Sequence, residues 1–72
     1  MSLKVVGETR NMLIIEADPK VYGIDRFRCT KDPEKIPDGA LMKVVKKGNK
    51  TEVVDATDEL RKLVKSYVGG GK

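Results

Sequence analysis

The side chains best suited to binding chemistry are cationic and gather in two places. The first group lies within eight positions, and no acid occurs between positions 40 and 50; it comprises Lys43, Lys46, Lys47 and Lys50. Lysine ammonium groups act on phosphates as mobile point charges, so these lysines are candidates for contact with nucleic acid. The same pattern is also typical of a hairpin tip kept soluble, or of an edge strand that lysine protects from aggregation.

The second group lies on one side of an expected strand over residues 21–30, where side chains alternate with period two. It comprises Tyr22, Arg26 and Arg28. Guanidinium planes and a tyrosine ring can stack on bases while the arginines bind phosphates. Aromatic residues make up only 4% of the chain, so no extended stacking surface is expected. The alternative is that Tyr22 covers the core and that both arginines pair with nearby acids.

Catalytic and metal chemistry is poorly supported by the composition. The chain has no histidine and one cysteine, which leaves no ordinary zinc site and no nucleophile paired with histidine. The nearby cations of Arg28 and Lys31 could lower the pKa of the Cys29 thiol, but a small apolar side chain on the inner face of a strand explains Cys29 better. We therefore expect a non-enzymatic protein with no catalytic residues, no cofactor and no metal.

Length and composition limit the organisation of the chain. Its 72 residues, 36% of them charged, predict a single domain over residues 1–68 and a flexible glycine-rich tail over residues 69–72. No apolar run reaches the roughly 20 residues of a membrane span, and the first residues lack the features of a signal peptide, so we expect a soluble, cytoplasmic protein. Glutamine is absent and only two asparagines occur, which is a composition typical of hyperthermophile proteins.

Five runs favour strands and one favours a helix. The strand-like runs are residues 3–7, 12–17, 21–30, 40–47 and 50–55, and a proline-rich loop is expected over residues 31–39. Gly48-Asn49 is a two-residue hairpin turn signal between the last two runs. The helix is indicated by apolar residues recurring three and four apart from Leu60 to Val68. Asp55 or Thr57 can cap its start, and Gly69 can end it.

These elements predict a β-rich α+β fold. We expect a small five-stranded antiparallel barrel or curled sheet, SH3- or OB-like, with one C-terminal amphipathic helix. Closure is favoured because a sheet of two or three strands could not bury all the apolar side chains. At the level of architecture alone, this arrangement resembles the small chromatin proteins of thermophilic archaea and small ribosomal proteins with barrel folds. No motif is shared residue by residue, so the resemblance assigns no site.

The charge balance gives the functional expectation. A net charge of +4 is basic enough to suggest an anionic partner such as nucleic acid, and mild enough to serve solubility alone. We expect a small basic nucleic-acid-binding protein, with structured RNA favoured over DNA, for example as an accessory protein of the ribosome or another large assembly. Two alternatives stay open, a protein–protein interaction module and a chromatin-type protein that binds duplex DNA. The oligomeric state is not indicated by the sequence, and no membrane partner is expected.

Overall fold

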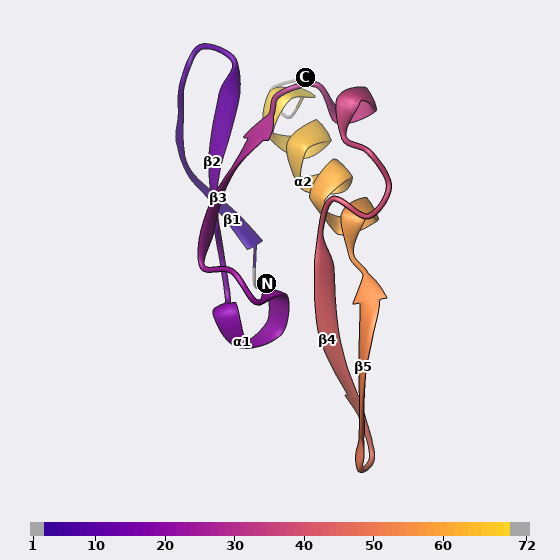
Figure 1. Cartoon of the computed structure of the whole chain (residues 1–72). Coiled ribbons are helices and arrows are strands. Elements are labelled where there is room, and N and C mark those ends of the chain that lie inside the picture. Colours follow the sequence, from indigo (N-terminus) through magenta and orange to yellow (C-terminus); the bar gives the residue numbers. More distant parts are fainter. Residues whose placement is uncertain (1–2, 70–72) are drawn as a thin grey trace.

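Residues 3–69 form two separate antiparallel sheets and one long helix (Figure 1). We describe them from a computed structural model. The elements in chain order are β1 (Leu3–Glu8), β2 (Met12–Ala17), α1 (Pro19–Tyr22), β3 (Arg26–Thr30), the 3-10 turn η1 (Pro33–Lys35), β4 (Met42–Lys47), β5 (Lys50–Asp55) and α2 (Thr57–Gly69). The N-terminal sheet has the strand order β1-β2-β3, and β4 pairs only with β5. No helix among residues 3–69 is both long enough and apolar enough to cross a membrane.

The central strand of the N-terminal sheet is β2, as its apolar side chains on both faces indicate. Leu13 and Ile15 are fully buried on the inner face, whereas Met12 and Ile14 lie half-buried on the outer face. β1 pairs with one edge of β2 and β3 with the other, both antiparallel. A strand with neighbours on both sides can bury one apolar face and partly cover the other, which is why this run tolerates so little polarity.

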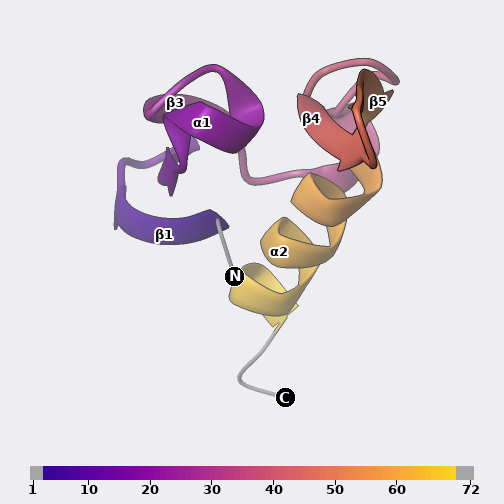
Figure 2. The same cartoon turned by 90° about the horizontal axis from the view of Figure 1, so that it is seen from below.

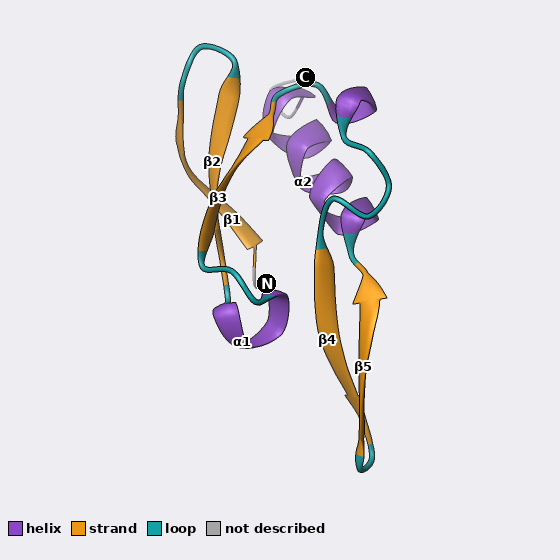
Figure 3. Cartoon of the chain, viewed as in Figure 1, coloured by secondary structure: helices purple, strands orange, loops and turns teal. Residues whose placement is uncertain are grey.

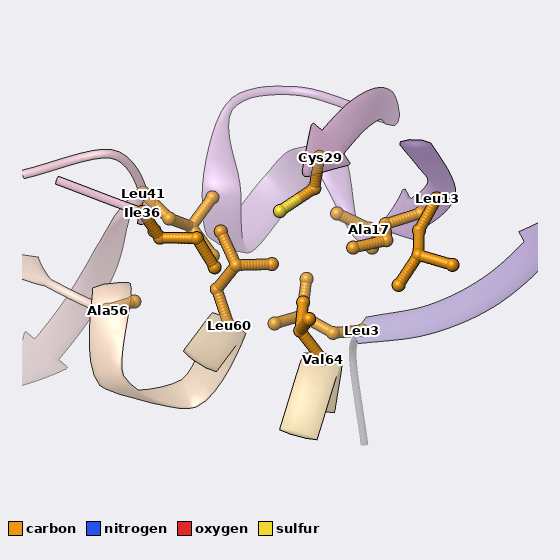
Figure 4. Close-up of a cluster of buried hydrophobic side chains, with 10 residues drawn as sticks. Leu3, Leu13, Ala17, Cys29, Ile36, Leu41, Ala56, Leu60 and Val64 are labelled. Atoms are coloured by element: carbon orange, nitrogen blue, oxygen red, sulfur yellow. The ribbon is translucent and has the colours of Figure 1, made fainter. Parts of the chain in front are cut away.

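The core lies between the inner face of the N-terminal sheet and α2. From the helix, Leu60 and Val64 point toward the sheet, and the loop residues Ile36 and Leu41 close one end (Figure 4). Cys29 is 7% exposed within this cluster, and burial raises the pKa of its thiol. The interpretation of Cys29 as a small core side chain is therefore confirmed.

The expected closure of all five strands into one barrel is not found among residues 3–69. The helix and the loop after β3 bury the inner face of the N-terminal sheet, and a second set of strands is not needed for that purpose. The β4–β5 hairpin instead extends away from the core (Figure 3). Val53 is 63% exposed and Met42 is 40% exposed, so apolar side chains that a closed barrel would have buried lie on the hairpin surface.

The expected strand over residues 21–30 is wrong in its first part. Asp18 caps α1 by accepting a hydrogen bond from the Lys20 N–H at 2.9 Å, Pro19 occupies the first turn, and Gly23 ends it with φ of 73°. Asp followed by Pro is a helix-start signal as well as a strand breaker. β3 consequently begins at Arg26, and Tyr22 belongs to α1.

The hairpin and the start of α2 follow the sequence closely. Lys47 pairs with Lys50 across a two-residue turn, and Gly48 alone has positive φ there, which is the type II′ pattern. Of the two candidate caps, Asp55 accepts a hydrogen bond from the Thr57 N–H at 2.7 Å. Gly69 is the last residue of α2, and the rest of the expected flexible tail, residues 70–72, lies outside the described residues.

Candidate nucleic-acid interface

The most prominent surface feature is the β4–β5 hairpin, residues 42–55, which we call the arm. Its strands run in register from Met42↔Asp55 to Lys47↔Lys50, which makes the arm about 17 Å long at the usual rise per residue. Figure 1 shows it extending beyond the helix and the N-terminal sheet. The molecule is accordingly elongated, with principal extents of 42 × 20 × 20 Å.

The far end of the arm is basic. Lys46, Lys47 and Lys50 are all exposed and flank the turn. Lys47 Nζ lies 3.6 Å from Glu52 Oε2, while Lys46 and Lys50 form no ion pair within the part of the chain that the structure describes. Because exposed pairs contribute little, Glu52 only partly offsets the three lysines. We call these three side chains the lysine tip.

Lys43 and Tyr22 have a different environment. Lys43 Nζ donates to Glu59 Oε2, and the Tyr22 hydroxyl donates to Glu59 Oε1 at 2.8 Å. Burial, together with this hydrogen bond, raises the pKa of Tyr22 to about 12, and the Lys43 contact lowers the pKa of Glu59. The cluster joins α1, β4 and α2 beside the core. Both predicted binding residues thus contact Glu59 in a structural cluster. The sequence offered a structural role as an alternative for Tyr22, as a cover of the core, and it offered no contact with Glu59 for Lys43.

The predicted arginines lie on the outer face of the N-terminal sheet. Arg26 is opposite Glu16, with 3.6 Å between Arg26 Nη2 and Glu16 Oε2, and Arg28 is opposite Ile14. Their neighbour in sequence, Cys29, points into the core, so the arginine side chains face away from α2. Figure 2 shows the N-terminal sheet and the arm on opposite sides of the view. The structure therefore does not bring the predicted lysines and arginines onto one surface.

An open hollow of about 780 Å³ adjoins Arg26, but its charges are mixed. Acids outnumber bases around it; the charged residues lining it are Lys4, Glu16, Asp18, Asp25 and Arg26. A polyanion would meet three carboxylates there. Residues 3–69 also contain no cluster of His, Cys, Asp or Glu that could hold a metal ion. The lysine tip is thus the better candidate for contact with phosphates.

Sequence reasoning missed an acidic group at the other end of the arm. Arg61 donates to Asp38 Oδ1 at 2.7 Å and to Asp58 Oδ1 at 3.0 Å, and Asp55 Oδ2 accepts from the Gly39 N–H at 3.1 Å. We call the carboxylates of Asp38, Asp55 and Asp58 the acidic base. The proline-rich loop expected over residues 31–39 includes Asp38, but no sequence pattern placed this loop against the start of α2.

Comparison with known proteins adds no assignment to this geometry. No family model, no curated protein and no solved structure matches the chain. Among the described residues, the arm remains the most distinctive feature, because it extends from the body and ends in three lysines.

Proposed function

We propose that this protein binds structured RNA through the lysine tip, without catalysing a reaction. The observation that carries the proposal is that a group of positive charges lies away from the body of the protein. Three lysines and one acid lie at the end of an arm about 17 Å long. Phosphates are closely spaced along a nucleic acid, so a small group of lysines can release several counterions on binding. The arm contributes reach, and the lysines contribute affinity.

The shape of the arm favours folded over single-stranded nucleic acid. A two-stranded ribbon is narrow enough to enter the major groove of duplex DNA. In folded RNA, where the major groove is narrow, it would lie against the wide minor groove or between packed helices. No aromatic side chain lies on residues 42–55, so stacking on unpaired bases, the usual means of holding single strands, is not available there. The tip also lacks arginine, the side chain that most often reads guanine. Binding should consequently depend on backbone shape more than on sequence.

The test removes the lysine tip and compares it with a charge-matched control. The first variant is Lys46→Ala/Lys47→Ala/Lys50→Ala, and the control replaces three exposed lysines outside the arm, Lys20, Lys35 and Lys65, with alanine. Both lose the same charge. Affinity for transfer RNA and ribosomal RNA is measured across a salt series, with duplex DNA in parallel.

The tip variant should bind RNA more weakly, and the slope of log K against log salt should flatten by roughly 0.7–0.9 for each lost phosphate contact. The control should bind nearly as the wild type does, and thermal unfolding should be almost unchanged in both. Equal losses in the two variants, or no binding of the wild type at low salt, would refute the proposal. Stronger binding and bending of duplex DNA would favour the chromatin-type alternative instead.

A further inference from the structure

The outer edge of β5 offers unpaired peptide groups. The Ala56 N–H donates to the Leu41 carbonyl at 2.8 Å, which continues the β4–β5 ladder past the end of the strand. Peptide groups in an antiparallel pair alternate between facing the partner and facing outward. The peptide groups of the even-numbered residues of β5 therefore face β4, and the peptide groups of Thr51, Val53 and Asp55 face outward. Figure 3 shows β5 on the outer side of the arm, away from α1.

This edge lacks two of the usual protections against strand addition, proline and a bulge, and two of its charged side chains, Lys50 and Glu52, lie toward the tip of the arm. Residues 50–53 are all exposed, the strand contains no proline, and its pairing with β4 has no bulge. β1, by contrast, carries a bulge between Val5 and Gly7. Long regular edges with exposed apolar side chains are templates for another strand. Val53 is 63% exposed at the middle of this edge.

The two ends of the arm carry opposite charges. The lysine tip is at one end, and the acidic base is at the other. In the acidic base, the side chains of Asp38 and Asp58 are 91% and 87% exposed. Arg61 offsets one of the three carboxylates, so a negative excess remains beside the start of α2. A strand that adds to β5 is therefore favoured if its own basic end meets the acidic base.

We propose that a second copy of this chain adds to the β5 edge, so that the two arms form a four-stranded antiparallel sheet in the order β4-β5-β5-β4. Two-fold symmetry makes the adjacent β5 strands antiparallel, which sets each lysine tip beside the partner's acidic base. The arm is thus complementary to itself in this orientation. A parallel arrangement would instead bring the two lysine tips together.

The register of the two β5 strands is determined by which residues share a face of the sheet and by which charges would lie opposite each other. A two-fold axis normal to the sheet keeps each face on its own side, so opposed residues are both odd-numbered or both even-numbered. Centring the pair on residue 52 would set Glu52 opposite the partner's Glu52, which is unfavourable. Centring it on residue 53 sets Val53 opposite the partner's Val53 and lets the outward peptide groups pair. This second register is the one that the arm favours.

The association should be weak, because one added strand buries little area compared with a standard interface. It should also be sensitive to salt, because opposite charges meet at both ends of the paired strands. Sedimentation equilibrium of the full chain, freed of nucleic acid and studied up to about 1 mM, detects such a contact. Val53→Lys places two lysines against each other at the axis, and Val6→Lys makes the same change at a 42% exposed valine of β1. Both substitutions leave the lysine tip in place.

We expect a concentration-dependent dimer for the wild type and for Val6→Lys, and at least tenfold weaker association for Val53→Lys. Thermal unfolding of each variant controls for folding. A wild type that stays monomeric throughout, equal losses in the two valine variants, or assembly beyond the dimer would overturn the proposal. Because no nucleic acid is present, the result is independent of RNA binding.

Charge reversal tests the orientation of the two arms. Lys50→Glu and Asp58→Lys should each weaken the dimer, since each sets like charges together between tip and base. The double variant Lys50→Glu/Asp58→Lys should recover most of the lost association, because opposite charges again meet across the interface. Single variants that weaken the dimer without recovery in the double variant would rule out the antiparallel arrangement.

Discussion

The buried hydroxyl of Thr57 joins the start of α2 to the loop that precedes β4. This residue is 1% exposed, and its Oγ1 accepts from the Gly39 N–H at 3.1 Å and from the Leu41 N–H at 3.3 Å. The same oxygen lies 3.4 Å from the Leu41 carbonyl, to which it can donate. Replacing Thr57 by valine keeps the shape and removes all three contacts, so it isolates what the hydroxyl contributes.

The expected cost comes mainly from Leu41. The Gly39 N–H retains Asp55 Oδ2 at 3.1 Å, whereas the Leu41 N–H, on a residue only 5% exposed, loses its acceptor. Leaving one buried donor unsatisfied costs about 1–3 kcal/mol. In a domain of this size, each kcal/mol corresponds to a fall in Tm of roughly 4–8 °C. Thr57→Ser keeps the hydroxyl and loses one methyl group, at about 0.8 kcal/mol.

Urea denaturation and amide hydrogen exchange test this reasoning together. Thr57→Val should lower the free energy of unfolding and speed exchange of the Leu41 amide specifically. Thr57→Ser should leave that amide protected, although it also loses some stability. A Thr57→Val variant as stable as the wild type, with Leu41 still protected, would show that the hydroxyl does not stabilise the loop that precedes β4.

Two further predictions concern the core and a titrating side chain. Leu13→Ala removes a fully buried side chain and should cost about 2–5 kcal/mol in urea denaturation, whereas Leu63→Ala, at a half-buried position, should cost less. In a Tyr67→Phe variant, the tyrosinate absorbance reports Tyr22 alone and should show a pKa of about 12. Because the folded pKa of Tyr22 is raised above 10.0, its stabilising contribution is present below pH 10.0 and is lost as the pH rises toward 12, which the free energy of unfolding against pH would show.

Local patterns predicted individual elements well. The runs over residues 12–17 and 50–55 are strands with those bounds, and the apolar stripe from Leu60 predicted α2. Each of these signals lies within a few residues of chain: alternation, a two-residue turn, or a helical repeat. They depend little on what the element packs against.

The arrangement of elements was less accessible from the sequence. Val53 and Met42 have the residue types of a core, and only the packing of α2 on the N-terminal sheet shows that the core is complete without them. Arg26 and the lysine tip lie on different surfaces for a similar reason. Which face of each sheet points outward is decided by contacts between residues that are far apart in the chain. A charge count cannot distinguish one patch from two.

A single residue, Ala56, lies between the end of β5 and the start of α2, and it is 2% exposed and hydrogen-bonded to Leu41. Because no flexible linker separates them, we expect the arm and the helix to move together as one rigid body. A force applied at the lysine tip should then reach the side chains of α2 that pack against the N-terminal sheet.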